Sequence, residues 1–309
     1  MSSEALCDII IINWNSGDLL NNCIKSIKEG KGVKLISKIY IVDNASIDNS
    51  INAINSFSDI HIIKNDKNLG FAAACNQGIY ASNSKYILFL NPDTELLENS
   101  LLDSFLFMEN NSDIDVLGVK HIDIKKVTQK SCSRFPTLKN YFYDIIGLSK
   151  IYPKFFNPAT VMTDWDHEES KLVDQVMGAF MFVRRDSIDL YGKFDEQFFV
   201  YYEDLDFARR VWDRGGKIYY LSNIEIVHEG GGITSRVKDL RLFYSLRSRL
   251  LYGLKYFPKH HFVILLILTL TVEPFTRVIN LLFKLKYSEI LDIFKGYKML
   301  YGYLIRTHI

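Results

Sequence analysis

The chain has 309 residues, of which 48% are hydrophobic and 24% charged, so it can bury a substantial core and is not a disordered protein. Its net charge is only +1, but residues 1–235 hold 24 lysines and arginines against 32 acidic residues, whereas residues 236–309 hold 13 against 4. An acidic body followed by a basic, apolar segment indicates a surface that meets anions. We expect that surface to be a membrane and expect no nucleic acid partner.

Cysteine usage and the N-terminus predict an intracellular setting. The four cysteines show neither CxxC spacing nor the density of a secreted scaffold. The first residues lack the basic region and long apolar core of a signal peptide. The longest apolar run, residues 262–272, is shorter than a membrane span, and we expect Glu273 and Pro274 to interrupt it. We therefore predict a cytoplasmic protein that lies on the inner face of the cell membrane.

The first hundred residues alternate strand and helix signals. Strands are expected at residues 8–13, 39–42, 60–64 and 86–90, and helices at 18–27 and 70–80. This alternation predicts a mostly parallel sheet with helices on both faces. Ligands of such sheets bind beyond the carboxyl ends of the strands, where this chain places Asn13, Asp43, Asn44 and residues 91–93.

Three turns near these strand ends have side chains that can bind a nucleotide. The Asp43-Asn44 turn can hydrogen-bond a base edge or a ribose hydroxyl, or simply cap the next helix. Gly70, after Asn68, allows close backbone approach, and the helix that follows favours a phosphate, although a glycine before a helix is common. Asp93 can hold Mg²⁺ or Mn²⁺ against a diphosphate, or serve as the capping residue of a proline turn.

The second half of the chain is less regular before it becomes helical. Residues 111–175 are interpreted as loops with short elements, a candidate lid on the acceptor side, and residues 175–184 as a strand. A helix at 205–214 ends at a glycine pair, and a further strand is expected at 217–221. His228 then follows as a second metal ligand, a diphosphate contact or a structural histidine.

Residues 194–206 carry five acidic residues in thirteen positions, interleaved with aromatics, and include the pair Glu203-Asp204. Apolar surroundings raise a carboxylate's pKa and suit it to proton abstraction. The alternative is an acidic first turn that the helix macrodipole stabilises.

From Leu240 onward the pattern is helical and amphipathic, and basic residues precede the apolar run. This arrangement predicts a helix that lies in the membrane interface, with a buried core helix or a dimer contact as the alternatives. A lipid that carries a diphosphate would explain both the positive charge and the apolar surface. The basic residues are Arg236, Lys238, Arg241, Arg247 and Arg249.

Five segments taken in series resemble the inverting family 2 nucleotide-sugar glycosyltransferases, and more closely the rhamnosyltransferase-like branch that builds bacterial polysaccharides. The resemblance covers residues 6–235, and the order of the segments makes it specific. They are IYIVDNASIDNS at 39–50, NLGFAAACNQG at 68–78, LFLNPD at 88–93, GAF at 178–180 and FDEQFFVYYEDLDFARR at 194–210.

This resemblance implies a GT-A fold, an α/β nucleotide-sugar transferase domain at residues 1–235, followed by a basic, apolar helical tail at 236–309 that associates with a membrane. It implies a hexosyltransferase that moves rhamnose from dTDP-rhamnose, or a related sugar, to a saccharide acceptor on a polyprenyl diphosphate. The setting would be polysaccharide or O-antigen synthesis. The tail's apolar helices also make a homodimer an open expectation.

The resemblance also assigns roles to single residues. Asp204 matches the catalytic base, and Glu203 would orient the acceptor or the base. Asp93 looks like the last residue of the DxD metal motif, whose first acid is here Asn91, so metal dependence is less secure. His228 matches a histidine that helps hold the metal and diphosphate. The remaining donor-binding candidates are Asn13, Asp43, Asn44, Asn68, Gly70, Asn91 and Arg236.

The chemistry requires such a set. Inverting transfer is a single displacement at the anomeric carbon, so a base must take the acceptor's proton while a cation and hydrogen-bond donors stabilise the leaving diphosphate. A nucleotidyltransferase is a weaker alternative, because no glycine-rich, lysine-bearing loop follows the first strand. A catalytically degenerate sugar-nucleotide-binding scaffold is the third possibility, because one acid of the DxD motif is absent.

Overall fold

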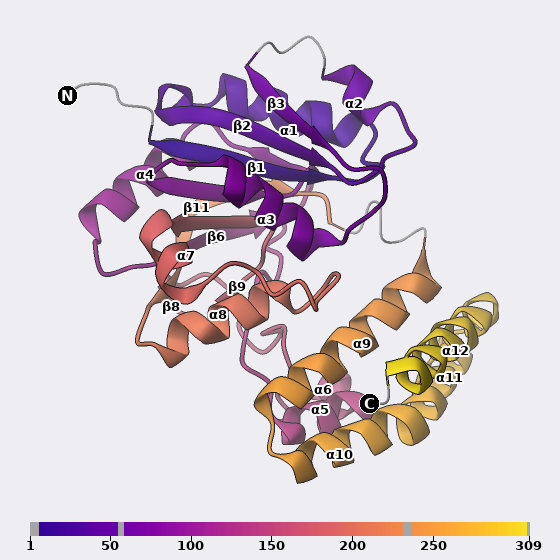
Figure 1. Cartoon of the computed structure of the whole chain (residues 1–309). Helices are drawn as coiled ribbons and strands as arrows, with labels where there is room; N and C mark the ends of the chain where they lie inside the picture. The colour runs from indigo at the N-terminus through magenta and orange to yellow at the C-terminus, as the bar shows by residue number, and fades with distance from the viewer. Residues whose placement is uncertain (1–5, 55–58, 231–236, 308–309) are drawn as a thin grey trace.

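A computed structural model describes residues 6–54, 59–230 and 237–307. It shows a central sheet flanked by helices, with a group of C-terminal helices packed beside it (Figure 1). The boundary expected between residues 235 and 236 lies outside the described residues.

The N-terminal half of the sheet is parallel, in the order β3-β2-β1-β4. The strands expected in this half are confirmed to within three residues, since β-branched runs form buried parallel strands. The strands are β1 (Cys7–Asn13), β2 (Ile36–Asp43), β3 (Ile60–Lys64) and β4 (Tyr86–Leu90), and the connecting helices are α1 (Asp18–Glu29), α2 (Ser50–Ala53) and α3 (Phe71–Ala81). A short 3₁₀ turn, η1 (Val33–Leu35), leads into β2.

Helices cover both faces of this sheet because side chains alternate along each strand. In β1, Ile9 and Ile11 belong to one buried cluster with side chains of α1, α2 and α4 (Ser100–Asn110). Ile10 and Ile12 belong to a second cluster with side chains of α3, α7 (Arg185–Tyr191) and α8 (Glu203–Asp213). Figure 1 shows α3, α7 and α8 on the same side of the sheet.

The second half makes the sheet mixed. Strand β10 (Phe180–Arg184) runs antiparallel to both β4 and β6 (Val116–Ile122), and β11 (Ile218–His228) pairs in parallel with β6. The edge strands β5 (Thr94–Leu96) and β8 (Lys171–Leu172) both pair antiparallel with β11.

Two details of the middle segment differ from the expectation. Strand β6 lies inside the segment predicted to be loops with short elements. It was not predicted because Lys120 and His121 interrupt its apolar run. The single strand expected at 175–184 is two: β9 (Gln175–Val176) pairs with β7 (Cys132–Ser133) in a separate small sheet, and β10 joins the main sheet after a turn. That turn carries Gly178, which faces Asp204.

The C-terminal helices form a third buried cluster, which includes Leu246, Leu250, Leu265 and Leu300. They pack with α5, which has α6 beside it; both lie between β6 and β10 in sequence and next to the C-terminal helices in Figure 1. The helices are α5 (Leu138–Ile145), α6 (Leu148–Ile151), α9 (Lys238–Tyr256), α10 (Lys259–Ile267), α11 (Glu273–Phe283) and α12 (Ile290–Thr307); a 3₁₀ turn, η4 (Tyr287–Glu289), precedes α12.

Glu273 and Pro274 interrupt the apolar run but do not end the helix, so the expectation that this segment is too short to span a membrane is wrong. Helices α10 and α11 are joined through a π-helical turn, Leu268–Val272, into one continuous helix from Lys259 to Phe283. Proline has no N–H for the carbonyl four residues before it, and the Tyr301 hydroxyl donates to that carbonyl, on Leu270, at 2.7 Å. By length and composition alone, this helix could cross a membrane.

Candidate active site

A cleft of about 980 Å³ lies at the carboxyl ends of the parallel strands. The strand ends contribute Asn44 and Asn91, the loop before α8 contributes residues 199–202, and α9 contributes Arg241 and Tyr244 from its first two turns. The C-terminal segment therefore forms part of the cleft wall as well as the helical group beside it.

The amide of Asn44 organises the side of the cleft next to β2 and α3. Its Oδ1 accepts from the Leu69 N–H at 3.0 Å, and its Nδ2 donates to the Gly70 carbonyl at 3.0 Å. Gly70 has φ +91°, and a Cβ there would lie 2.4 Å from the Phe199 carbonyl oxygen. That carbonyl accepts from the Phe71 N–H at 2.6 Å. Gly70 thus allows the close approach of α3 to the loop before α8. The first N–H of α3 is bonded to that loop, so it is not free to bind a phosphate.

Asp43 and Asn13 meet at the ends of paired strands, where Asn13 Nδ2 donates to Asp43 Oδ1 at 2.8 Å. The same amide donates to the hydroxyls of Ser46 and Ser50 at 2.9 Å. Both side chains are buried and neither lines the cleft, whereas their neighbour Asn44 does. Asn68 lines the cleft, and its Oδ1 accepts from the Gly70 N–H at 2.9 Å.

Asp93 and His228 come together because β5 pairs with β11 at that point. Asp93 Oδ1 lies 3.5 Å from His228 Nε2, and both side chains line the cleft beside Asn91. Gln129, which the sequence analysis did not single out, holds the histidine: its Nε2 donates to the His228 carbonyl at 2.8 Å, and its Oε1 lies 3.2 Å from Nδ1. If Nδ1 donates its proton to this amide oxygen, the Nε2 lone pair is left to bind a cation shared with Asp93; without a cation, the carboxylate beside Nε2 favours a proton there.

These residues fit a divalent cation that the substrate also binds. Within residues 6–54, 59–230 and 237–307, no group of three or more His, Cys, Asp or Glu side chains is arranged to hold a metal ion. Asp93 and His228 could supply two ligands, and a cation of the Mg²⁺ type binds through one or two protein ligands together with substrate phosphates and water. These two possible metal ligands therefore fit a cation that binds together with a diphosphate.

Glu203 and Asp204 open α8 and line the cleft. Asp204 Oδ2 accepts from Gln175 Nε2 at 2.8 Å and from the Gly178 N–H at 3.2 Å, and Oδ1 accepts from the Leu205 N–H at 2.8 Å. Glu203 Oε2 is buried and has no hydrogen-bond partner among the described residues.

The two carboxyl groups differ in proton affinity. Burial raises the pKa of both, and the neighbouring Asp204 charge raises the pKa of Glu203 further. The backbone N–H donors of Gly178 and Leu205 oppose the rise in the pKa of Asp204. Asp204 therefore loses its proton first, and Glu203 keeps its proton to a higher pH.

The backbone before this pair is strained. Tyr201 and Tyr202 have φ angles of +66° and +72°, a region that bulky residues rarely occupy. The Tyr202 ring packs 5.6 Å from that of Tyr252, and its hydroxyl lies 3.1 Å from the hydroxyl of Tyr141. These contacts hold the turn that directs Glu203 and Asp204 toward the cleft.

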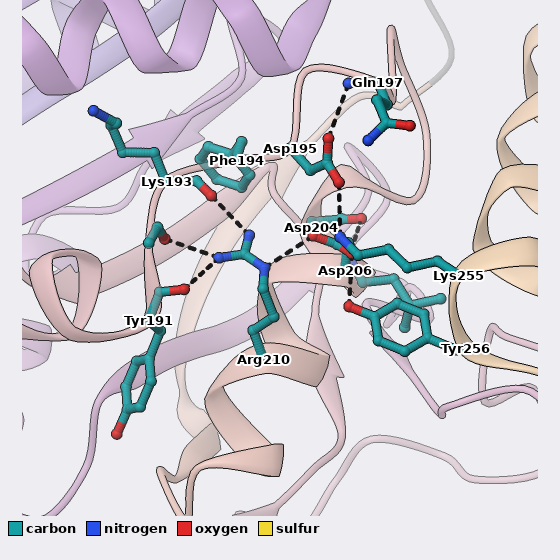
Figure 2. Close-up of polar contacts among 12 residues, drawn as sticks. Tyr191, Lys193, Phe194, Asp195, Gln197, Asp204, Asp206, Arg210, Lys255 and Tyr256 are labelled. Atoms are coloured by element: carbon teal, nitrogen blue, oxygen red, sulfur yellow. Dashed lines mark hydrogen bonds and ion pairs between the residues drawn. The ribbon is translucent and has the colours of Figure 1, made fainter.

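A buried ionic network centred on Asp206 fixes α8 (Figure 2). The Asp206 carboxylate has no exposed area and accepts from the Tyr256 hydroxyl at 2.7 Å, Lys255 Nζ at 2.6 Å and Arg210 Nε at 3.0 Å. Lys255 also reaches Asp195 at 2.7 Å. The other guanidinium nitrogens of Arg210 donate to the carbonyls of residues 191–193. The network joins the loop before α8, α8 itself and the end of α9.

Helix α9 contacts the loop before α8 at further points. Arg247 donates to the Gln197 carbonyl at 3.1 Å, Ser248 donates to the Val200 carbonyl at 2.9 Å, and the rings of Tyr244 and Phe199 stack at 4.6 Å. These contacts place α9 along the segment that carries Glu203 and Asp204.

Several of the basic tail residues therefore have partners within the protein. Arg249 is buried and pairs with Glu273, Arg247 binds the Gln197 carbonyl, and Arg241 lines the cleft. Arg236, predicted as a donor contact, lies outside the described residues. No signal in the sequence separates Arg241 from its basic neighbours.

The mixed sheet with helices on both faces, and a cleft with carboxylates at the strand ends, defines an α/β protein of the GT-A type. The sequence model described as "Glycosyl transferase family 2" matches residues 8–187. This match covers more than half of the chain, and the chain belongs to that family.

Curated relatives agree with this assignment at modest identity. The chain is 22% identical over 256 residues to a low-salt glycan biosynthesis hexosyltransferase of Haloferax volcanii, covering 81% of this chain and 76% of that protein. It is 23% identical over 244 residues to an N-acetylglucosaminyl-diphospho-decaprenol L-rhamnosyltransferase of Mycobacterium tuberculosis, covering 74% and 77%. It is 26% identical over 150 residues to the rhamnosyltransferase WbbL of Escherichia coli K12, covering 48% of this chain and 53% of the relative, about half its length.

Solved structures show the same fold. A mannosyltransferase from Pyrobaculum calidifontis, in complex with GDP-Man and Mn²⁺, superposes with a TM-score of 0.54 at 14% identity, over 97% of this chain and 84% of that one. The expected fold class is confirmed, and the chain is a glycosyltransferase with rhamnosyl- and hexosyltransferase relatives.

Proposed function

We propose that the protein is an inverting, metal-assisted glycosyltransferase that moves a sugar, rhamnose from dTDP-rhamnose in the first instance, from a nucleotide diphosphate to a saccharide acceptor on a polyprenyl diphosphate. One observation carries the proposal: the Asp93–His228 pair and the Asp204 carboxylate line the same cleft. A cation site and a base facing one cavity are what a single displacement with a diphosphate leaving group needs.

The donor would bind beyond the ends of β1 and β4. Asn44 and Asn68 face the nucleoside side of the cleft, and Asp43 supports that wall from behind through Asn13. Asp93 and His228 would hold the cation, which would offset the negative charge that develops on the diphosphate. Asn91 in place of an acid leaves the protein with fewer ligands, so metal affinity should depend strongly on bound donor.

Asp204 would be the base. As the new bond forms between the acceptor oxygen and the anomeric carbon, the bond to the diphosphate breaks and the hydroxyl proton passes to Asp204. Gln175 and the Gly178 N–H hold the Asp204 carboxylate in place. Glu203, whose Oε2 has no hydrogen-bond partner among the described residues, would orient the acceptor or the base.

The proposed acceptor rests on the name of one relative and on the exposed apolar surface of the tail. The mycobacterial relative's name specifies a diphospho-decaprenol, and the tail of this chain exposes large apolar side chains on α10, α11 and α12. We propose that this surface lies on the cytoplasmic leaflet, in polysaccharide or O-antigen synthesis. Examples of these exposed side chains are Ile267, Phe275, Ile279, Phe283 and Phe294.

The test is an Asp204→Asn variant with Asp189→Asn, an exposed aspartate of α7, as the matched control. Loss of a general base should lower turnover by about 10²–10⁴-fold while donor binding stays unchanged. A near-wild-type rate in Asp204→Asn would contradict the assignment. A donor screen by mass spectrometry across dTDP-, UDP- and GDP-sugars would identify the sugar.

A degenerate scaffold is the second candidate, because the described residues give the cation only two acidic or histidine ligands. Such a scaffold would bind the nucleotide sugar and never release its sugar. Donor hydrolysis measured with Mn²⁺, with and without a chelator, separates the two. Chelator-sensitive hydrolysis supports the enzyme, and binding without hydrolysis under every metal condition supports the scaffold.

A further inference from the structure

A second cavity, of about 580 Å³, lies between α5, α8, α9 and α10. We call it the tail groove. Its walls are mainly aromatic and aliphatic, and three basic side chains stand among them: Lys139 on α5, Arg209 on α8 and His261 on α10. No acidic side chain lines it within the part of the chain that the structure describes. The apolar wall includes Leu138, Phe142, Tyr252, Phe257, Ile264 and Leu268.

The cations of the tail groove are held at its walls. Arg209 lies over the rings of Phe135 and Tyr256, at 5.1 and 5.7 Å, and its Nε donates to Asp213, which lies outside the groove, at 2.8 Å. Lys139 Nζ lies 5.7 Å from the centre of the Tyr143 ring. Basic side chains placed over aromatic rings, with no acid in the same cavity, complement an anion attached to an apolar group.

The tail groove borders the exposed apolar face of the C-terminal helices. Ile264 lines the groove and is 43% exposed, and Phe142 lines it from the other side and is 41% exposed. Val263 and Ile267 of the same helix lie on the outer surface. A hydrocarbon chain could pass from a bilayer into the groove without crossing a polar rim on this side.

The groove is also close to the cleft. On α8, Glu203 lines the cleft and Arg209 lines the groove, six residues apart, which is about 9 Å of helix rise. On α9, Ser245 lines the cleft and Tyr252, seven residues later, lines the groove. The rings of Tyr202 and Tyr252, 5.6 Å apart, form the wall between the two cavities.

We infer that the tail groove binds the diphosphate and the first isoprenoid units of a lipid-linked acceptor, so that its saccharide reaches Asp204 over the Tyr202–Tyr252 wall. The inference rests on the proposed function for its reaction, but the binding site can be tested separately. Arg209, Lys139 and His261 would contact the diphosphate, and Ile264 and Leu268 would contact the chain.

Binding is measured on the full-length protein with three probes: farnesyl diphosphate, farnesol and inorganic diphosphate. Farnesyl diphosphate should bind best, and an Arg209→Gln, Lys139→Gln variant should weaken it by roughly tenfold or more, the scale of one charge-assisted hydrogen bond. Leu268→Trp should fill the groove and weaken the binding of farnesyl diphosphate, while inorganic diphosphate should bind as it does to wild type. Lys38→Gln, an exposed lysine of β2, is the control.

Transfer supplies the second readout. The rate with a polyprenyl-diphosphate acceptor, divided by the rate with the same saccharide in water-soluble form, should fall by roughly tenfold in Arg209→Gln, Lys139→Gln. An unchanged ratio, or equal farnesyl diphosphate binding in variant and wild type, would overturn the inference. So would displacement of the probe by a second copy of the chain, seen as concentration-dependent dimerisation. If wild type transfers to neither acceptor, the proposed function fails, and the probe measurements still decide the groove.

Discussion

Replacing Asp206 with alanine should destabilise the protein through the partners that it leaves behind. Lys255 and Arg210 would lose their shared carboxylate, and the Tyr256 hydroxyl would lose its acceptor. Removing one partner of a fully buried ion pair costs about 3–5 kcal/mol. The Lys255 side chain is 35% exposed and keeps Asp195, so we expect about 2–3 kcal/mol after solvent screening.

Thermal and urea unfolding measure this loss. A change of about 2–3 kcal/mol corresponds to a Tm lower by about 3–5 °C in a protein of this size. The matched control is Asp213→Ala, which removes a half-exposed carboxylate from the same helix. That change should stay within about 0.5 kcal/mol of wild type.

A further experiment separates the lost ion pair from the lost packing in the destabilisation of Asp206→Ala. A double-mutant cycle of Asp206→Ala with Lys255→Met should give a coupling energy of about 1–3 kcal/mol. Because the network holds the loop that carries Glu203 and Asp204, kcat should fall more than KM rises. An Asp206→Ala protein as stable as Asp213→Ala, or a coupling near zero, would refute this reasoning.

The site leads to four further predictions. Gly70→Ala should destabilise the protein by about 1–3 kcal/mol in urea unfolding, because its Cβ would strike a carbonyl oxygen at 2.4 Å; Gly147→Ala, also at positive φ but in open space, should cost less. Burial raises the pKa of Asp204, so the acid limb of kcat/KM should lie above the ordinary aspartate value of about 3.9, with activity lost as pH falls. Because the pKa of Glu203 is raised, its contribution to stability is greatest below the ordinary glutamate pKa and is lost as pH rises through the folded-state value, a loss that Glu203→Gln should remove. A chelator should stop donor hydrolysis, Mn²⁺ should restore it, and His228→Gln should raise the Mn²⁺ concentration needed for half the maximal rate; an unchanged Mn²⁺ requirement would remove His228 from the site.

The sequence predicts the parallel half of the sheet because its signals are local. The β-branched run of β1 and the acidic-amide turn after Val42 follow from propensity and from where parallel strands end. Strand β6 was missed because Lys120 and His121 break its apolar run. The site residues that were missed, Gln129 and Gln175, lie in the irregular segment and act through contacts 99 and 29 residues away.

The contacts that the tail helices make could not be predicted, for a related reason. Helix periodicity shows that a face is apolar, but it does not say what covers that face. Nothing near Pro274 in the sequence indicates that the Tyr301 hydroxyl, 31 residues from Leu270, satisfies the Leu270 carbonyl. Nor does a run of basic residues show that Arg249 is buried against Glu273.

The buried charges of α11 bear on how the helix Lys259–Phe283 would meet a membrane. Glu273 sits near its middle, is bonded to Arg249 of α9 and to Arg277, and is 3% exposed. A helix that crossed a bilayer away from α9 would separate Glu273 from Arg249 and carry the remaining Glu273–Arg277 pair into hydrocarbon, which costs several kcal/mol. With α9 and α12 packed on one face and apolar side chains exposed on the other, the helix can keep its ion pairs only if it lies along the surface. This orientation also keeps the tail groove open toward the lipid.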